Sequence, residues 1–198
     1  MIAVIFGPPG AGKGTQGDNI TRMFGLPRVA TGDMLRAEVE KGSALGREVE
    51  PIMTAGRLAP DDLVVRVIEE RLRQTDAARG VLLDGFPRTV AQAEALDRML
   101  RAGGRAVDLV LVLEVPREVL IERLLRRAEA EGRADDTPET IGRRLEVYGQ
   151  QTAPVLDWYA QHGARVERVD GVGTIEVVRD RIRDAFATVG GDGRKLAS

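Results

Sequence analysis

Residues 7–15 read Gly-Pro-Pro-Gly-Ala-Gly-Lys-Gly-Thr and have the spacing of a phosphate-binding loop. Glycines let the backbone curl so that successive N–H groups point into one concavity, and such a nest at a helix N-terminus binds phosphate. Lys13 adds a positive charge for the β- and γ-phosphates of a nucleotide. Gly14 stands where a Ser or Thr usually follows the lysine, and Thr15 comes one place later. A glycine-rich turn with a chance lysine is disfavoured, because an apolar run precedes the loop and a helical pattern follows it.

A second group of polar residues follows the apolar run 81–83. Asp84 ends that run, and a carboxylate there suits the magnesium end of a P-loop site, directly or through water. The alternative is a turn residue before Gly85. Arg88 comes next, at the carboxyl end of a predicted central strand, where doubly wound folds bind ligands. Its planar guanidinium suits a phosphate, although a lone arginine is more often a surface residue.

Arginines in the last third of the chain form a further candidate group. Arg123 and Arg127 are four residues apart and so share a helix face. Arg133 lies in a polar segment, and Arg143 and Arg144 lie on the next predicted helix. Most of the 29 basic residues are arginines, so a solvated surface cluster is a strong alternative. Spacing alone leaves both interpretations open.

The elements that must position these residues follow from the hydrophobic pattern. Short apolar runs predict strands at 2–6, 81–84, 109–115 and 165–169. Helical patterns cover 13–24, 61–73, 89–101, 117–130, 138–161 and 174–187. This alternation predicts an α/β fold with a parallel sheet covered by helices on both faces. Residues 31–59 interrupt the alternation with helices around Gly42 and Gly56, which predicts an inserted helical subdomain.

Composition limits the class of protein. The 198 residues suffice for a single domain, and 43% hydrophobic with 30% charged residues is ordinary for a soluble globular chain. The net charge of −2 gives no indication of a nucleic-acid or membrane-surface partner. Cysteine is absent, which excludes disulfides and Cys-ligated zinc. The first apolar run is too short for a signal peptide or membrane span, so we expect a cytoplasmic protein. Nothing demands more than a monomer, and the glycine-rich tail 189–198 is expected to be disordered.

Several separate motifs resemble those of the adenylate kinase family over residues 1 to about 188. They are the loop at 7–15 including its Gly14, Thr31-Gly32-Asp33-Met34-Leu35-Arg36, Asp84-Gly85-Phe86-Pro87-Arg88-Thr89, and Gly132-Arg133-x-Asp135-Asp136 followed by Arg144. The resemblance implies a P-loop NTPase fold with a five-stranded parallel sheet flanked by helices. It also implies that 31–59 form an AMP-binding subdomain and that 127–138 form a short lid.

The resemblance also implies roles for individual residues. The ATP phosphates would be held by Gly10, Ala11, Gly12, Lys13, Gly14 and Thr15, together with Arg123 and Arg127. AMP would be bound by Thr31, Arg36, Met53, Arg57, Leu58, Ala59, Val64, Gly85, Arg88, Gln92, Arg133 and Arg144, with Gln92 reading the adenine. The catalytic cations would be Lys13, Arg88, Arg123, Arg127, Arg133 and Arg144. Asp33 and Asp84 would hold Mg²⁺ through water, and Asp135 and Asp136 would pair with arginines as the lid closes. Ala59 stands where relatives carry a larger aliphatic residue.

The activity implied is reversible phosphoryl transfer from MgATP to AMP, giving two ADP by direct in-line transfer. Such a reaction depends on positioning and charge neutralisation and needs no covalent intermediate. Thr31 is also expected to cap the first inserted helix. The alternatives are a UMP/CMP kinase, a GTP-using phosphotransferase, or a non-catalytic P-loop binding module that signals by nucleotide state. The Asn-Lys-x-Asp segment that reads guanine in such switches is absent.

Overall fold

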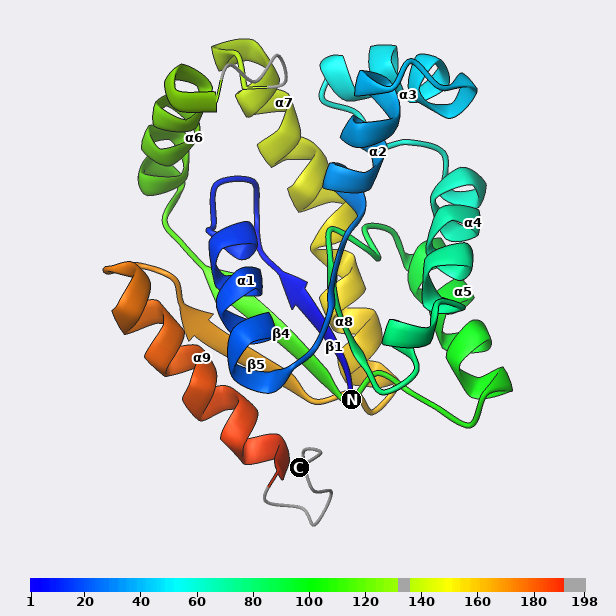
Figure 1. Ribbon diagram of the computed structural model, residues 1–198. Coiled ribbons are helices and arrows are strands. Elements are labelled where there is room, and N and C mark those ends of the chain that lie inside the picture. Colours follow the sequence, from blue (N-terminus) through cyan, green and yellow to red (C-terminus); the bar gives the residue numbers. More distant parts are fainter. Residues whose placement is uncertain (132–135, 191–198) are drawn as a thin grey trace.

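A five-stranded parallel sheet forms the centre of the protein, with helices around it (Figure 1). Its strand order is β2-β3-β1-β4-β5. The computed structural model describes residues 1–131 and 136–190. The strands are β1 (Ile2–Phe6), β2 (Arg28–Ala30), β3 (Val81–Asp84), β4 (Leu109–Glu114) and β5 (Val166–Asp170). All five residues of β1 and all four of β3 are buried, because helices cover both faces of the sheet.

Strand β2 is the one strand that the hydrophobic pattern did not predict. It has three residues, of which only Val29 is a buried apolar side chain. A strand this short gives no period-2 signal, and it is held by pairing with β3, where Val29 lies opposite Leu83. Strands β1 and β3 have the predicted bounds, and the ends of β4 and β5 differ from the prediction by one residue.

Helices cover both faces of the sheet, and each face packs with its helices in a separate apolar cluster. The α-helices are α1 (Lys13–Phe24), α2 (Thr31–Glu40), α3 (Ala44–Thr54), α4 (Asp61–Leu72), α5 (Val90–Ala102), α6 (Arg117–Glu131), α7 (Pro138–Val147), α8 (Pro154–Gln161) and α9 (Ile175–Gly190). Because side chains alternate along a strand, Val4 packs with Leu96 of α5 on one face. Ile5 packs with Ile20 of α1 and Ile182 of α9 on the other.

The helical pattern predicted over 138–161 is confirmed, but the structure divides this range into two α-helices. Helix α7 ends at Val147 and a π-helical turn covers Tyr148–Thr152, in which the Ala153 N–H bonds to the Tyr148 carbonyl at 2.8 Å. Pro154 then occupies the first turn of α8. A proline has no N–H to continue the helical ladder, so it suits the start of a new helix.

The region 31–59 is helical, as predicted, and consists mainly of α2 and α3. Gly42 has φ 62 between the two helices, and Ser43 caps α3 by accepting a hydrogen bond from the Gly46 N–H at 2.9 Å. A Cβ on Gly46 would lie 2.0 Å from the Glu38 carbonyl oxygen. The two helices therefore meet at a point where only glycine fits.

Two predicted segments lie partly outside the described residues. The lid at 127–138 includes the end of α6 and the start of α7, and residues 132–135 between them are not described. Helix α9 runs to Gly190, two residues into the expected tail, and residues 191–198 are not described. No helix in the described ranges is long and apolar enough to cross a membrane.

Candidate active site

The phosphate-binding loop connects β1 to α1, as the sequence predicted. Gly10 has φ 84 and Gly12, the residue before α1, has φ 92. A Cβ on Gly10 would also lie 2.9 Å from the Leu120 carbonyl oxygen of α6. Glycine is therefore required at Gly10 by both backbone conformation and space. Lys13 is the first residue of α1, at the positive end of the helix dipole.

The Lys13 ammonium closes back on its own loop. Its Nζ donates to the carbonyl oxygens of Gly7 at 2.6 Å and Pro8 at 3.1 Å. Burial and, to a smaller extent, the positive charges of Arg88 and other nearby guanidiniums lower its pKa from 10.5 to about 8, while Asp84 acts in the opposite direction. Lys13 therefore lies in a strongly cationic site to which an anion would bring compensating charge.

Two adjoining cavities meet at this lysine. The first has a volume of about 130 Å³ and lies between the sheet edge, α2, α3 and the turn after β3. The second has a volume of about 460 Å³ and lies over the phosphate-binding loop and α6. Both are lined by the same four cationic side chains: Lys13, Arg36, Arg88 and Arg144. A shared cationic boundary suits two phosphate groups that approach each other from opposite sides.

Every described residue that was predicted to bind AMP lines the first cavity. These are Thr31, Arg36, Met53, Arg57, Leu58, Ala59, Val64, Gly85, Arg88, Gln92 and Arg144. Arg133 lies outside the described residues. The Thr31 hydroxyl is buried and has no hydrogen-bond partner within the described part of the chain, so a ligand would satisfy it. The prediction that Thr31 caps α2 is wrong, because Thr31 is its first residue and Ala30 precedes it without a side-chain cap.

Gln92 is buried rather than a helix-surface residue, with 2% of its area exposed. Its Oε1 accepts from the Arg88 backbone N–H at 2.7 Å, and its Nε2 donates to Asp61 Oδ1 at 2.7 Å. Arg88 donates from Nε to the Gly85 carbonyl at 2.9 Å, and its own carbonyl accepts from Thr152 at 3.0 Å. This network joins the turn after β3 to α4 and the π-helical turn.

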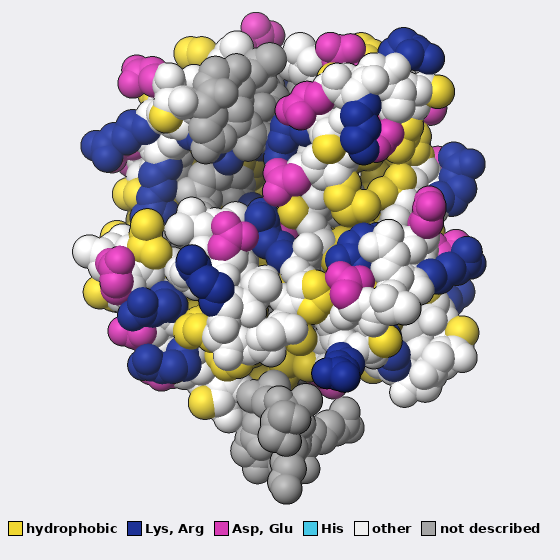
Figure 2. All heavy atoms as spheres, viewed as in Figure 1, with side chains coloured by type: hydrophobic (Ala, Val, Ile, Leu, Met, Phe, Trp, Pro, Cys, Tyr) yellow, Lys and Arg dark blue, Asp and Glu magenta, His cyan; other side chains and the backbone are white. Residues whose placement is uncertain are grey.

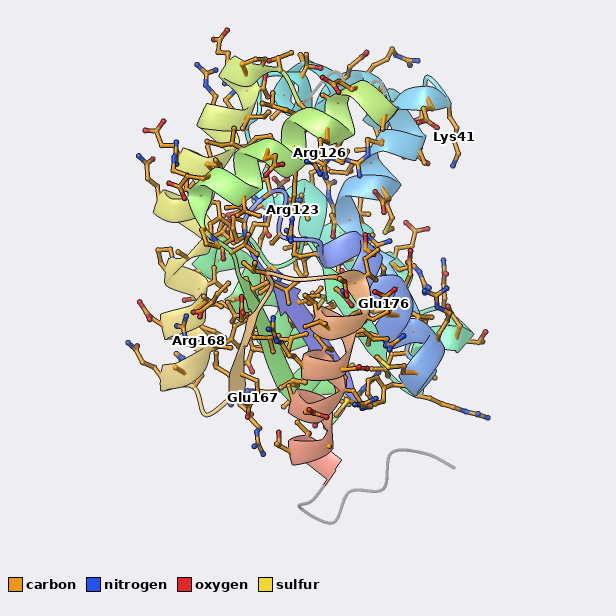
Figure 3. The ribbon with its side chains drawn as sticks, turned by 90° about the vertical axis from the view of Figure 1, so that its left-hand side faces the viewer. Lys41, Arg123, Arg126, Glu167, Arg168 and Glu176 are labelled. Carbon is orange, nitrogen blue, oxygen red and sulfur yellow. The ribbon has the colours of Figure 1, made fainter. Side chains whose placement is uncertain are left out.

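The predicted ATP-side residues line the second cavity, with one exception. Gly10, Gly12, Lys13, Gly14, Thr15, Arg123 and Arg127 all face it. Ala11 is buried at 2% exposure, and its N–H bonds to the Pro8 carbonyl at 3.1 Å inside the loop. Arg123 extends from α6 toward the loop before α9, where Nη2 donates to the Gly171 carbonyl at 3.1 Å (Figure 3).

Asp136 joins the arginines at the base of the predicted lid. Its carboxylate is fully buried and accepts two hydrogen bonds from Arg127, at 2.6 and 2.9 Å. The same carboxylate pairs with Arg144 of α7. Pairing of Asp136 with arginines was expected for the closing lid, and it is present here. Asp135 lies outside the described residues.

Asp33 and Asp84, the predicted magnesium residues, both line the second cavity beside the phosphate-binding loop. Carboxylate oxygens at such a place fit a hard cation held through water, with nucleotide phosphates as further ligands. In the described ranges no group of three or more His, Asp or Glu side chains encloses a metal position.

Arg28 is a site residue that sequence reasoning missed. Its Nε and Nη2 donate to Asp84 Oδ2 at 3.0 and 2.6 Å, and Nη2 lies 3.3 Å from Asp33. It crosses the first turns of α1, where a Cβ on Gly17 would lie 2.7 Å from Arg28 Cδ. Arg28 was missed because it begins β2, the strand that the pattern did not reveal.

Phosphoryl transfer between two molecules needs two binding sites that share cations at their boundary, and the two cavities have this arrangement. Together with the phosphate-binding loop and the parallel sheet, they define a P-loop phosphotransferase. A family model described as adenylate kinase matches residues 5–164. A protein named adenylate kinase from Stenotrophomonas maltophilia (strain R551-3) is 48% identical over 186 residues, covering 94% of this chain and 99% of that protein. One of the same name from Xanthomonas euvesicatoria pv. vesicatoria (strain 85-10) is 49% identical over the same shares. The chain belongs to the adenylate kinase family.

Proposed function

We propose that this enzyme catalyses reversible transfer of the γ-phosphoryl group of MgATP to AMP, giving two ADP. The observation that carries the proposal is the set of four cations, Lys13, Arg36, Arg88 and Arg144, on the boundary of two adjoining cavities. The names of the relatives agree with this activity.

ATP is assigned to the second cavity, with its phosphates on the loop and its base toward Arg123. The backbone N–H groups at the start of α1 and the Lys13 ammonium would bind the β- and γ-phosphates. Arg123 and Arg127 of α6 would neutralise the transferring group, joined by Arg133 of the lid. Asp33 and Asp84 would hold Mg²⁺ through its waters, and the ion would supply charge neutralisation at the phosphate oxygens.

AMP is assigned to the first cavity. Its phosphate would lie against Arg36, Arg88 and Arg144, and its base between the apolar walls formed by Met53, Ala59 and Val64. The unpartnered Thr31 hydroxyl and the buried Gln92 amide are polar groups available to the nucleotide among the described residues. Leu58, Arg57 and the Gly85 backbone complete that lining.

The reaction itself is a direct displacement. An AMP phosphate oxygen forms a bond to the γ-phosphorus while the bond from that phosphorus to the β,γ-bridging oxygen breaks, and its electrons leave with ADP. Fixed cations neutralise the equatorial oxygens as charge redistributes, which is the main catalytic contribution in this chemistry. The AMP phosphate is largely ionised at neutral pH, so no strong general base is needed.

The two substrate covers are part of the proposal. The subdomain 31–59 would close over AMP and the lid 127–138 over ATP, excluding water that would otherwise hydrolyse ATP. We also propose that the protein acts in the cytoplasm as a monomer, since the cations assigned to both nucleotides come from one chain. Light scattering and cell fractionation check these two statements.

The test is product formation from ATP with AMP, CMP, UMP or no acceptor. We expect ADP from ATP plus AMP, with AMP preferred over both pyrimidine nucleotides. Preference for CMP or UMP would identify a UMP/CMP kinase, and ATP binding without transfer to any acceptor would identify a nucleotide-binding module.

Lys13→Met provides the matched loss-of-function test. Loss of one preorganised charge typically costs roughly 100-fold or more in turnover, and we expect that loss in a variant whose cooperative thermal melting shows that the fold is intact. Retention of more than about a tenth of wild-type turnover would contradict the role of Lys13.

A further inference from the structure

Asp61, the first residue of α4, lies at the centre of a hydrogen-bond network behind the first cavity. Its Oδ1 accepts from Gln92 Nε2 at 2.7 Å, and its Oδ2 accepts from the Thr89 hydroxyl at 3.0 Å. The Thr89 hydroxyl in turn accepts from the Gln92 backbone N–H at 3.2 Å as the N-cap of α5. Each bond in this network has one direction only, because an ionised carboxylate accepts and a backbone N–H donates.

The Gln92 amide is therefore fixed in one orientation. Its nitrogen must face the Asp61 carboxylate, which only accepts, and its oxygen must face the Arg88 N–H, which only donates. Turning the amide by 180° would place oxygen against carboxylate and nitrogen against N–H. Both are repulsive contacts at a side chain that is 2% exposed, where water does not compensate them.

One N–H and one oxygen lone pair of Gln92 remain for a ligand, counting its hydrogen bonds within the described residues. Gln92 lines the first cavity beside Ala59 and Val64. The fixed amide thus offers a donor and an acceptor in an order that cannot be reversed. Adenine presents the complementary edge, because its amino group donates and the adjacent ring nitrogen accepts. Hypoxanthine, uracil and guanine present the reverse order, with a carbonyl that accepts and a ring N–H that donates.

We propose that Asp61 is a positioning residue that sets acceptor specificity, by locking Gln92 in the orientation that fits a 6-amino base and rejects a 6-oxo base. This inference rests on the proposed function, since it requires a nucleotide base in the first cavity. Inosine monophosphate (IMP) is the sharpest probe, because its base has the size of adenine and the reversed edge. The cytosine edge has the same donor and acceptor order as the adenine edge. We therefore expect CMP and UMP both to be poor acceptors, with CMP used better than UMP.

The experiment compares AMP and IMP as acceptors, as kcat/KM, in wild type, Asp61→Asn, Gln92→Ala and the double variant. Asparagine keeps the shape of Asp61 but offers Gln92 either a donor or an acceptor. We expect wild type to prefer AMP by roughly 100-fold or more, since a buried polar edge left unpaired is costly. Asp61→Asn lowers that ratio by about tenfold, through the KM of the acceptor, and leaves the KM of ATP unchanged. Asp61→Ala, which removes both acceptors, is the second variant and raises the KM of AMP as well.

The matched control is Asp62→Asn. Asp62 is the next residue in the first turn of α4, with a side chain 79% exposed and 3.6 Å from Arg66. The Asp62→Asn variant removes one negative charge from the same end of α4 as Asp61→Asn does. We expect its ratio of kcat/KM for AMP to kcat/KM for IMP to stay at the wild-type value. Thermal melting and AMP binding by calorimetry accompany each variant. In the Gln92→Ala background, Asp61→Asn changes the ratio by less than about twofold, because its effect passes through Gln92.

Two results would overturn the role of Asp61 without touching the proposed function. One is an unchanged ratio in Asp61→Asn while Gln92→Ala lowers it, and the other is an equal loss with and without Gln92. A wild type that uses IMP as well as AMP would likewise overturn the lock while leaving phosphoryl transfer intact. Absence of any transfer from ATP to AMP would overturn both.

Discussion

Arg28 shows how one side chain can stabilise the site without facing either base. Its guanidinium donates twice to Asp84, whose side chain is 9% exposed, and lies against the glycine-rich first turns of α1. A carboxylate this buried needs a charged partner, because an unpaired one would be strongly desolvated.

Arg28→Ala should therefore destabilise the protein. Loss of the charge-assisted hydrogen bonds to a buried carboxylate costs about 2 kcal/mol. For a chain of this size that lowers Tm by about 4–8 °C. Arg168→Ala is the control. Arg168 of β5, labelled in Figure 3, pairs with Glu114 of β4 at 2.7 Å, and both side chains are more than half exposed. Such surface pairs contribute about 0–1 kcal/mol, so equal Tm losses in the two variants would contradict our account of Arg28.

Arg88 lies on the boundary of both cavities and at the carboxyl end of β3. Arg88→Ala should lower AMP-dependent turnover by roughly 100-fold or more, because a cation near the transferring group is lost. ATP affinity should change far less, since the loop and Lys13 still hold its phosphates. Titration of ATP binding beside steady-state kinetics separates the two, and an ATP-binding defect as large as the turnover defect would assign Arg88 to the wrong nucleotide.

At the scale of elements, the contact between α2 and α3 depends on Gly46. An added Cβ would meet the Glu38 carbonyl oxygen at 2.0 Å, and backbone cannot yield as a flexible side chain does. Gly46→Ala should separate the two helices, destabilise the protein by about 1–3 kcal/mol and raise the KM of AMP more than that of ATP.

Gly142→Ala is the control for that variant. Gly142 lies inside α7, and a Cβ there meets nothing within 4 Å. Alanine in a helix interior stabilises by up to about 1 kcal/mol relative to glycine, so this variant should melt no lower than wild type. If Gly46→Ala melts as high, the close approach of α2 and α3 is not the constraint that we infer.

The elements also show what sequence reasoning could reach. Strands β1, β3 and β4 were predictable because their buried residues form apolar runs, one of which ends at Asp84. Strand β5 gave a weaker signal, since Val169 is its one buried residue. The π-helical turn was not, since the apolar spacing of 138–161 continues through it and only Pro154 marks the break. The orientation of Gln92 was also out of reach, because it depends on Asp61, which is 31 residues away and has no motif of its own.

At the scale of the whole molecule, charge is balanced overall and concentrated locally. The net charge is −2, and basic and acidic side chains are interspersed over the face shown in Figure 2. Around the phosphate-binding loop, by contrast, Lys13 lies among Arg88, Arg144 and Arg127, whose charges lower its pKa. Attraction for nucleotides is therefore a property of the cleft rather than of the surface.

This arrangement links stability to pH. The Lys13 pKa is about 8 in the folded protein, below the 10.5 expected when the chain is unfolded. Between these values the unfolded chain binds more protons than the folded one, so the Lys13 contribution makes stability rise as pH rises from about 8 to 10.5. The contribution is fully present above that window and is lost as pH falls through it.

Binding of ATP should reverse the shift of Lys13. The phosphates bring negative charge to the ammonium and raise its pKa, so binding near pH 8.5 should take up a fraction of a proton per site, and ATP affinity should fall as pH rises above about 8. Calorimetry at saturating ATP in two buffers of different ionisation enthalpy measures the proton uptake. Lys13→Met should abolish it, whereas Lys41→Met should not, because Lys41 is 67% exposed and pairs with Glu38 on α2. Equal uptake in wild type and Lys13→Met would assign the proton to another group, and no uptake in wild type would mean that the phosphates do not reach the Lys13 ammonium.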